Sequence, residues 1–222
     1  MRKSLIIPSL LALGVAAPAV HAHEAGDIIV RAGSIWVVPD EDSQRLKIND
    51  GSVSGTKATV GSDTQLGLNF AYMLTDHFAV ELLAATPFTH TVGVRGLGAL
   101  DGKLANVKEL PPTLSLVYYP LKSSYAFQPY VGFGVNYTMF LGNNLTGERH
   151  AQGFSNMHMS NSWGWAAQFG ADYMLTDSIM VNAQVRYIDI STQARVHLGA
   201  NEVKADVNID PWVYMVGLGY KF

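Results

Sequence analysis

The chain has 222 residues, which suits one domain, and its 15 basic and 18 acidic residues give a formal net charge of −3. Without a basic surplus, the composition gives no support for nucleic-acid binding. The chain contains no cysteine, which excludes disulfides and thiolate metal sites.

The first 22 residues have the pattern of a secretory signal peptide. A basic start at residues 1–3 precedes an apolar run over residues 5–19 that contains two prolines. Val20-His21-Ala22 then offers the small residues of a cleavage site. A spanning helix would need about 20 apolar residues without such breaks. We therefore expect residues 1–22 to be removed in export and residues 23–222 to form one domain.

The remaining chain alternates with the period of two residues that is typical of β-strands. In the segment 64–74, one face carries Leu66, Leu68, Phe70 and Tyr72, and the other face carries small or polar residues. The segments that alternate in this way are residues 27–38, 64–74, 78–94, 107–120, 127–141, 161–174, 179–194 and 205–222.

The connections between these segments alternate between short and long. Residues 74–77, 121–126 and 175–178 form short turns, whereas residues 39–63, 93–106, 142–160 and 195–204 are longer and are expected to be loops. This alternation is typical of outer-membrane barrels, which have short periplasmic turns and long extracellular loops. The pattern predicts an all-β protein, an eight-stranded antiparallel up-and-down transmembrane barrel. Both termini would lie on the periplasmic side.

A soluble eight-stranded barrel, such as a lipocalin, is the alternative with the same strand count. It would bury the large apolar face and expose the small or polar one. Eight strands enclose too little volume to bury every bulky face at once, so the large side chains are expected to face lipid. Aromatic residues near the strand ends are expected to form interfacial girdles. They are Trp36, Tyr72, Tyr118, Trp163, Tyr173, Trp212 and Tyr220.

Residues on the other face should line the lumen, where strand direction gives their height. Charged and amide side chains fall low in the barrel, and opposite charges buried together should pair. The low positions are Asp27, Arg31, Glu81, Asp172, Asn182 and Lys221. Small or apolar residues fall at middle and upper height: Gly33, Ile35, Leu83, Ala85, Val117, Gly132, Gly134, Gly164, Ala166, Ile188, Val213 and Met215.

These positions suggest an apolar pocket above a charged plug. Arg31, Glu81, Asp172 and Lys221 are expected to form the plug, and the upper glycines to leave room for a solute. The alternative is that the glycines only allow the strands to curve. Arg186 points inward at middle height, so a buried carboxylate should pair with it, Glu81 first and Asp172 next.

Prolines fall inside two neighbouring segments of the predicted barrel. Pro87 lies in the third segment, and Pro111 and Pro112 lie in the fourth. Each proline removes a donor from the strand pairing. The sequence therefore predicts a lateral opening in the wall at the height of Pro87, on the side that faces the fourth segment. The alternative is that these prolines merely end the pairing at the rim.

The last segment ends on Phe222, an aromatic residue on the predicted lipid face. A terminal strand of this kind resembles the signal by which the barrel assembly machinery selects outer-membrane proteins. We therefore expect Phe222 to direct assembly.

Several stretches resemble the OmpW family of outer-membrane proteins, and within it the Pseudomonas member. They occur in family order along the whole chain. The matching stretches are His23–Asp27, Asp63–Leu68, Val80–Phe88, Leu110–Leu114, Gln128–Gly132, Tyr187–Ile190 and Asp210–Tyr214.

The resemblance implies an eight-stranded barrel in the bacterial outer membrane that takes up small hydrophobic molecules through an apolar channel with a lateral exit. In the family, a Leu and a Trp are assigned to a constriction. The Leu matches Leu83, but Arg186 stands at the Trp position, so the gate cannot simply be transferred. Ile35, Val117, Val213 and Met215 would complete the channel lining.

No catalytic constellation, cofactor motif or metal-ligand spacing is apparent, so we expect a channel rather than an enzyme. Its expected partners are outer-membrane lipid, lipopolysaccharide, small hydrophobic solutes and the barrel assembly machinery. One alternative is a pathway for small neutral amino acids, which the family resemblance and Arg186 would support. Another is a closed structural or adhesion barrel that acts through its loops.

Overall fold

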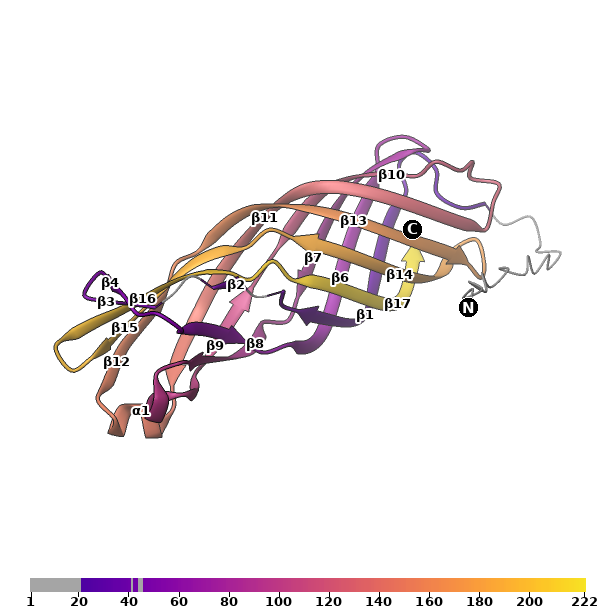
Figure 1. The fold of residues 1–222 in the computed structure, drawn as a ribbon. Helices are drawn as coiled ribbons and strands as arrows, with labels where there is room; N and C mark the ends of the chain where they lie inside the picture. The colour runs from indigo at the N-terminus through magenta and orange to yellow at the C-terminus, as the bar shows by residue number, and fades with distance from the viewer. Residues whose placement is uncertain (1–20, 41, 44–45) are drawn as a thin grey trace, which may run out of the picture.

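A computed structural model of the chain describes residues 21–40, 42–43 and 46–222. Eight antiparallel strands form a closed barrel, because β10 pairs both with β7 and with β11 (Figure 1). The barrel strands are β1 (Ile28–Val38), β6 (Asp63–Met73), β7 (Phe78–Ala85), β10 (Thr113–Tyr118), β11 (Phe127–Leu145), β13 (Ser162–Met174), β14 (Ile179–Ile188) and β17 (Trp212–Lys221). The predicted architecture is confirmed. The predicted signal peptide lies outside the described residues, apart from its last two positions.

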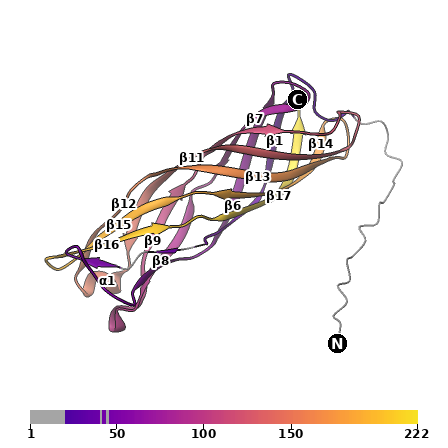
Figure 2. The same cartoon turned by 45° about the horizontal axis from the view of Figure 1, so that its top comes forward.

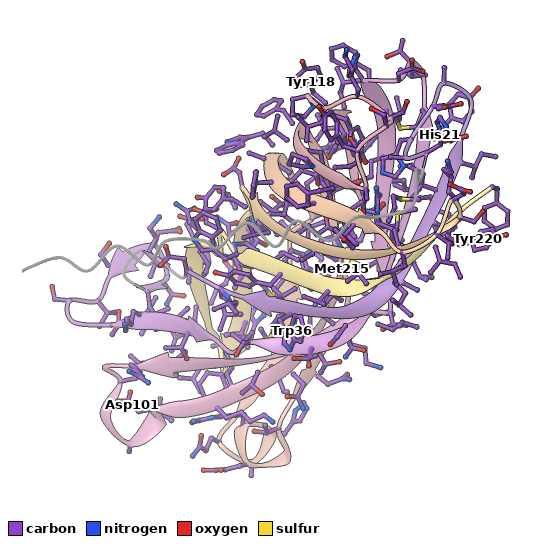
Figure 3. The ribbon with its side chains drawn as sticks, turned by 90° about the vertical axis from the view of Figure 1, so that its right-hand side faces the viewer. His21, Trp36, Asp101, Tyr118, Met215 and Tyr220 are labelled. Atoms are coloured by element: carbon purple, nitrogen blue, oxygen red, sulfur yellow. The ribbon has the colours of Figure 1, made fainter. Side chains whose placement is uncertain are left out.

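The outside of the barrel is apolar, as predicted for a lipid-facing wall. On β6, Leu66 and Phe70 are 52% and 43% exposed, while Gly67 and Asn69 between them are buried. All seven predicted girdle aromatics are exposed, and Trp163 reaches 73%. Tyr118 and Tyr220 lie at the end of the barrel that holds the chain termini, and Asp101 lies at the far end (Figure 3). A soluble barrel with a buried apolar face is therefore excluded.

Two threonines close the tight turns at the terminal end. Thr75 Oγ1 accepts hydrogen bonds from the backbone N–H of His77 and Phe78, at 3.2 and 3.0 Å. Thr176 Oγ1 does the same for Ser178 and Ile179. Each hydroxyl thus replaces a backbone acceptor inside the turn, which explains why the two short connections have similar sequences.

The expectation that the long connections are loops is wrong. Most of their residues extend the strands beyond the barrel, away from the chain termini (Figures 1 and 2). Four predicted strands are each divided in two, at residues 86–87, 111–112, 189–190 and 209–211. The additional strands are β2 (Asp42–Ser43), β3 (Lys47–Ile48), β4 (Gly51–Ser52), β5 (Lys57–Val60), β8 (Phe88–Arg95), β9 (Gly102–Leu110), β12 (Phe154–Met159), β15 (Ser191–Leu198) and β16 (Asn201–Asn208).

These strands form two sheets at the far end of the barrel. The β8–β9 sheet consists of β5, β8, β9 and the upper part of β11. The β15–β16 sheet consists of β12, β15, β16, β2, β3 and β4. Their apolar faces pack in one core that continues into the barrel and includes Ala58, Val94, Val196 and Val203. A short 3₁₀ turn (Gly98–Leu100) and α1 (Gly147–Ala151) connect strands at this end.

The glycines do not leave the room that the sequence predicted. A Cβ at Gly33 would clash with the backbone of Val216, and one at Gly164 would clash with the carbonyl oxygen of Asp189. At Gly132, the space is taken by the side chain of Gln168. These glycines therefore allow strands and side chains to approach closely. This observation favours the structural explanation of the glycines over room for a solute.

Phe222 gives the first testable prediction. Its ring is 71% exposed and stands 4.6 Å from the ring of Tyr220, while its N–H donates to the carbonyl of Ile28 at 2.9 Å. The side chain is thus presented to lipid and is not needed for packing inside the barrel. Deleting Phe222 should reduce the amount of inserted barrel in cells while the purified chain still folds in detergent.

Heat-modifiable mobility in gels measures both quantities, and Phe222→Tyr, which keeps an aromatic ring, is the matched control. A normal amount of inserted barrel after the deletion would contradict a role in assembly.

Candidate solute pathway

A buried ion pair crosses the lumen at middle height. Arg186 on β14 donates through Nη2 to Glu81 Oε1 on β7 at 2.6 Å, and also to Gln168 Oε1 on β13. Both charged side chains are at most 1% exposed. The predicted partnership of Arg186 with Glu81 is confirmed. It spans the barrel, since β7 and β14 are not neighbours in the wall.

A second ion pair lies beside the first one. Arg31 donates to both carboxylate oxygens of Asp172, at 2.9 and 2.6 Å, and its Nη1 lies 3.4 Å from Glu81 Oε2. The ring of His23 approaches Asp172 from the other side, with Nε2 at 2.9 Å from Oδ2. Two guanidinium groups and two carboxylates thus form one connected, formally neutral cluster, which we call the charged layer. Such reciprocal pairing is what a charge needs when no water surrounds it.

Lys221, which was expected in the plug, lies apart from this layer. Its ammonium donates to the carbonyl oxygens of His21 and Ala22 and lies 3.6 Å from Asp27 Oδ2, at the terminal mouth of the barrel. Val117 is also lower than expected. It packs with Ile29, Tyr119 and Tyr130 below the charged layer, because its register partners are Ala79 and Gly132 near the terminal end.

The other predicted lining residues form an apolar column above the charged layer. Ile35, Leu83, Val213 and Met215 are 1–4% exposed and belong to the same core as the two far-end sheets. Val213 is the cross-strand neighbour of Arg186, so the column begins directly at the charged layer. The column is filled with side chains, and the barrel is therefore closed in this conformation.

The column ends in a small apolar cavity between the two sheets. Its volume is about 30 Å³, and its wall comes from strands of both sheets. Among the lining residues are Leu46, Ala58, Val94, Leu104, Val196 and Val203. Since the cavity is smaller than an alkane-like solute, entry requires side chains to move apart. Met157, which also lines it, is unbranched and adapts easily to such changes.

Backbone pairing in the wall is interrupted where the prolines lie. Leu83 pairs with Thr113 and Phe88 pairs with Glu109, but no pair is formed between these two points. The carbonyl oxygens of Pro111 and Pro112 turn inward, where Asn136 Nδ2 donates to both at 3.1 Å. Backbone pairing is therefore interrupted near Pro87, on the side of the fourth segment, while the lateral opening predicted there stays a prediction. The hydroxyl of Thr113 also donates to Pro111 O, and the backbone N–H of Tyr137 donates to Pro112 O, so neither carbonyl is left unsatisfied beside lipid.

Above the interruption, a histidine and a glutamate connect β8 and β9. His90 Nε2 lies 3.0 Å from Glu109 Oε1, its Nδ1 lies 2.6 Å from the carbonyl oxygen of Gly61, and both side chains are buried. Burial lowers the pKa of His90. The hydrogen bond and charge of Glu109, with Gly61 and Asp63, outweigh this effect and raise the pKa above its ordinary value.

Several residues of this pathway were not predicted from the sequence. His23 was read only as the mature start, although it is buried against Asp172. Most of the cavity residues fall in segments that were expected to be loops, although Val203 continues the alternation of Ala205 and Val207 in the expected strand 205–222. Asn136 and the His90–Glu109 pair had no local signal, because their partners are distant in the chain.

No group of three or more potential metal ligands occurs within residues 21–40, 42–43 and 46–222. In the same residues, no helix is long and apolar enough to cross a membrane.

The charged layer predicts a large effect of removing Glu81. Glu81→Ala would leave Arg186 buried without a carboxylate, so we expect a loss of about 3–5 kcal/mol in the free energy of unfolding. Replacing both partners, in Glu81→Met with Arg186→Met, should recover most of this loss.

Urea unfolding in lipid vesicles, followed by tryptophan fluorescence, measures these free energies. Glu148→Ala, which removes an exposed carboxylate, is the control. If Glu81→Ala unfolded at the same urea concentration as the wild type, this result would contradict a structural role of the charged layer.

The His90–Glu109 pair predicts a dependence of stability on pH. A histidine whose pKa is raised by folding stabilises the protein fully below its unfolded value of about 6.5, and this contribution is lost as the pH rises through the folded value. The urea concentration at the unfolding midpoint of the wild type should therefore decrease as the pH is raised from about 6 to about 9. The decrease should be smaller in His90→Gln. His158→Gln, at an exposed position, should behave as the wild type. Equal pH dependence in all three proteins would contradict the prediction.

The comparisons with known proteins agree with this architecture. The model of the OmpW family matches residues 24–222. Outer membrane protein W of Vibrio cholerae is 43% identical over 224 residues, covering 100% of both chains. The crystal structure of OprG from Pseudomonas aeruginosa is 53% identical, with a TM-score of 0.89, covering 91% of this chain and 99% of that one. A Pseudomonas aeruginosa protein called dibenzothiophene metabolism operon protein PahQ is 27% identical over 180 residues, covering 81% of this chain and 82% of its own. The chain is a member of the OmpW family of outer-membrane β-barrel proteins.

Proposed function

We propose that this barrel is a channel for passive uptake of small hydrophobic molecules, which leave it sideways into the outer membrane. The observation that carries the proposal is the continuous apolar core that runs from the cavity, through the column, to the closed charged layer. An apolar solute can replace the contacts of Leu83 or Met215, but it cannot replace the hydrogen bonds of the paired ions.

The interrupted wall supports the sideways route. It begins at the height of Leu83, just above the charged layer, where the solute would have to stop. Ala84, Ala85 and Thr86, which lie beside the interruption, are small. Moving from here into hydrocarbon costs an apolar solute little, and no backbone hydrogen bond between β7 and β10 has to break.

One relative points in the same direction. The name of PahQ connects that protein with the metabolism of dibenzothiophene, a fused aromatic compound of low polarity. Uptake of such a compound would need a pathway like the one proposed for this chain.

A second candidate is passage of small neutral amino acids. Nε and Nη1 of Arg186 are buried and have no acceptor among the described residues. The carboxylate of an amino acid could receive hydrogen bonds from them. Against this candidate, the solute would first have to cross the apolar column.

Restoring donors in the wall tests the proposed exit. Prolines lie on both sides of the interruption, so we expect Pro87→Ala with Pro112→Ala to allow pairing between these strands and to slow the uptake of an alkane-like fluorescent solute severalfold. Uptake into vesicles with a lipopolysaccharide outer leaflet is the measurement. Pro120→Ala, at an exposed proline near the terminal end, is the matched control.

The two transport candidates differ in the same assay. Uptake of the apolar solute by the wild type, and not of labelled alanine, is expected. Unchanged apolar uptake in the double variant, with an intact barrel, would refute the lateral exit. Uptake of alanine alone would favour the second candidate.

A further inference from the structure

The two far-end sheets differ in how the charges on their outer faces are balanced. On the β15–β16 sheet, Lys47 pairs with Asp206 at 3.2 Å. Lys204 pairs with Asp50 at 3.2 Å and with Glu202 at 2.9 Å. The lysines of this face are therefore neutralised by acids of the same chain.

The outer face of the β8–β9 sheet carries cations that lack such partners. Lys57, Arg95, Lys103 and Lys108 are exposed, and none of them forms a salt bridge with a residue that the structure describes. Lys57 and Arg95 are directly opposite each other in the register of β5 and β8. Like charges in this arrangement repel each other and reduce stability. A face that keeps this repulsion is suited to an anionic partner.

The acids at the edge of this face form hydrogen bonds with backbone N–H groups and no salt bridge with these cations among the described residues. Asp63 accepts from the backbone N–H of Thr89 at 2.8 Å, and Asp101 accepts from the backbone N–H of Leu97 at 2.6 Å. Glu109, the other acid of these strands, is buried on the inner side against His90.

A hollow lies in the middle of the cationic face. It is lined by Thr59, Thr91, Arg95 and Lys103, with Asp101 at its edge. Gly93 and Gly102 leave its floor without side chains, and a Cβ at Gly93 would approach Thr59 Oγ1 to 2.9 Å. Two hydroxyls and two cations around a concave floor provide the donors that phosphate oxygens require.

The position of the face identifies the source of the phosphate. Trp36, in the outer aromatic girdle, pairs with Thr64. The neighbouring Asp63 accepts a hydrogen bond from the backbone N–H of Thr89, and Thr89 pairs with Lys108 on the next strand. Lys108 therefore lies near the girdle, and the hollow at Gly93 lies four residues further along β8, at most about 13 Å. The lipid facing this side of an outer-membrane protein is lipopolysaccharide, whose phosphates occur at these heights.

We propose that the outer face of the β8–β9 sheet binds lipopolysaccharide of the surrounding leaflet. Lys108 contacts a phosphate close to the membrane, and the hollow between Arg95 and Lys103 holds a phosphate of the inner core. Binding fixes the sheet that begins directly after Pro87 and forms one wall of the apolar cavity. The inference rests on the outer-membrane location and not on the proposed channel function.

The experiment combines removal of cations from the protein with removal of phosphates from the lipid, each alone and both together. Barrels in nanodiscs are loaded with lipopolysaccharide that carries inner-core phosphates or with the same lipid after dephosphorylation. Lipid retained after detergent extraction is counted by native mass spectrometry. The hollow variant is Lys57→Gln, Arg95→Gln and Lys103→Gln, and the matched control is Lys47→Gln with Lys204→Gln on the other sheet.

We expect the wild type and the control variant to retain phosphorylated lipid roughly tenfold better than the hollow variant. The difference should disappear with dephosphorylated lipid and shrink in about 1 M salt, where charges are screened within ~3 Å. Heat-modifiable mobility confirms that each barrel is folded. The proposal would be overturned if the hollow variant retained as much phosphorylated lipid as the wild type, or if the control variant lost as much as the hollow variant. It would also be overturned if the wild type retained phosphorylated and dephosphorylated lipid equally.

Discussion

The cluster of Arg31, Arg186, Glu81 and Asp172 is the constraint on which the rest of the barrel depends. Four charged groups are held in a lumen surrounded by lipid, where each would be prohibitively costly alone. They come from β1, β14, β7 and β13, so every ion pair ties together strands that are distant in the wall or in the chain. Because the four charges pair across the lumen, they close the barrel at this height and divide the lumen into an apolar upper part and a closed lower part.

The far-end sheets give this division its functional meaning. They extend the apolar upper lumen beyond the membrane and end in a cavity between two packed faces. On one side, the transition from barrel to sheet is made by Pro87, Pro111 and Pro112, where the strands separate. Asn136, Thr113 and the backbone N–H of Tyr137 donate to the proline carbonyls, so the separation leaves neither carbonyl unsatisfied beside lipid. The same construction thus places an apolar core, a closed charged layer and an interrupted ladder of backbone pairs next to one another.

The sequence predicted those features that depend on alternation or on a single charge. The strand faces, the girdles and the interruption at the prolines follow from local rules, and burying Arg186 required an acid. Glu81 was the first candidate as an inward-facing acid, although the sequence placed it low in the barrel and Arg186 at middle height. The hairpins β8–β9 and β15–β16 pair locally, but the sheets were missed because β5, β12 and β2–β4 join them from distant parts of the chain. The height of Val117 and the packing at Gly33 depend on barrel shear and close strand contacts, which no local pattern records.

The central claim is that an apolar solute enters the bilayer directly from the lumen. The most direct measurement uses vesicles with a lipopolysaccharide outer leaflet, a fluorescent apolar solute added outside, and albumin trapped inside. We predict that the barrel speeds the rise of fluorescence from the bilayer, and that albumin receives the solute only afterwards, at the rate of release from lipid. Delivery to the trapped albumin before the bilayer signal would contradict the account, because it would require passage through the charged layer.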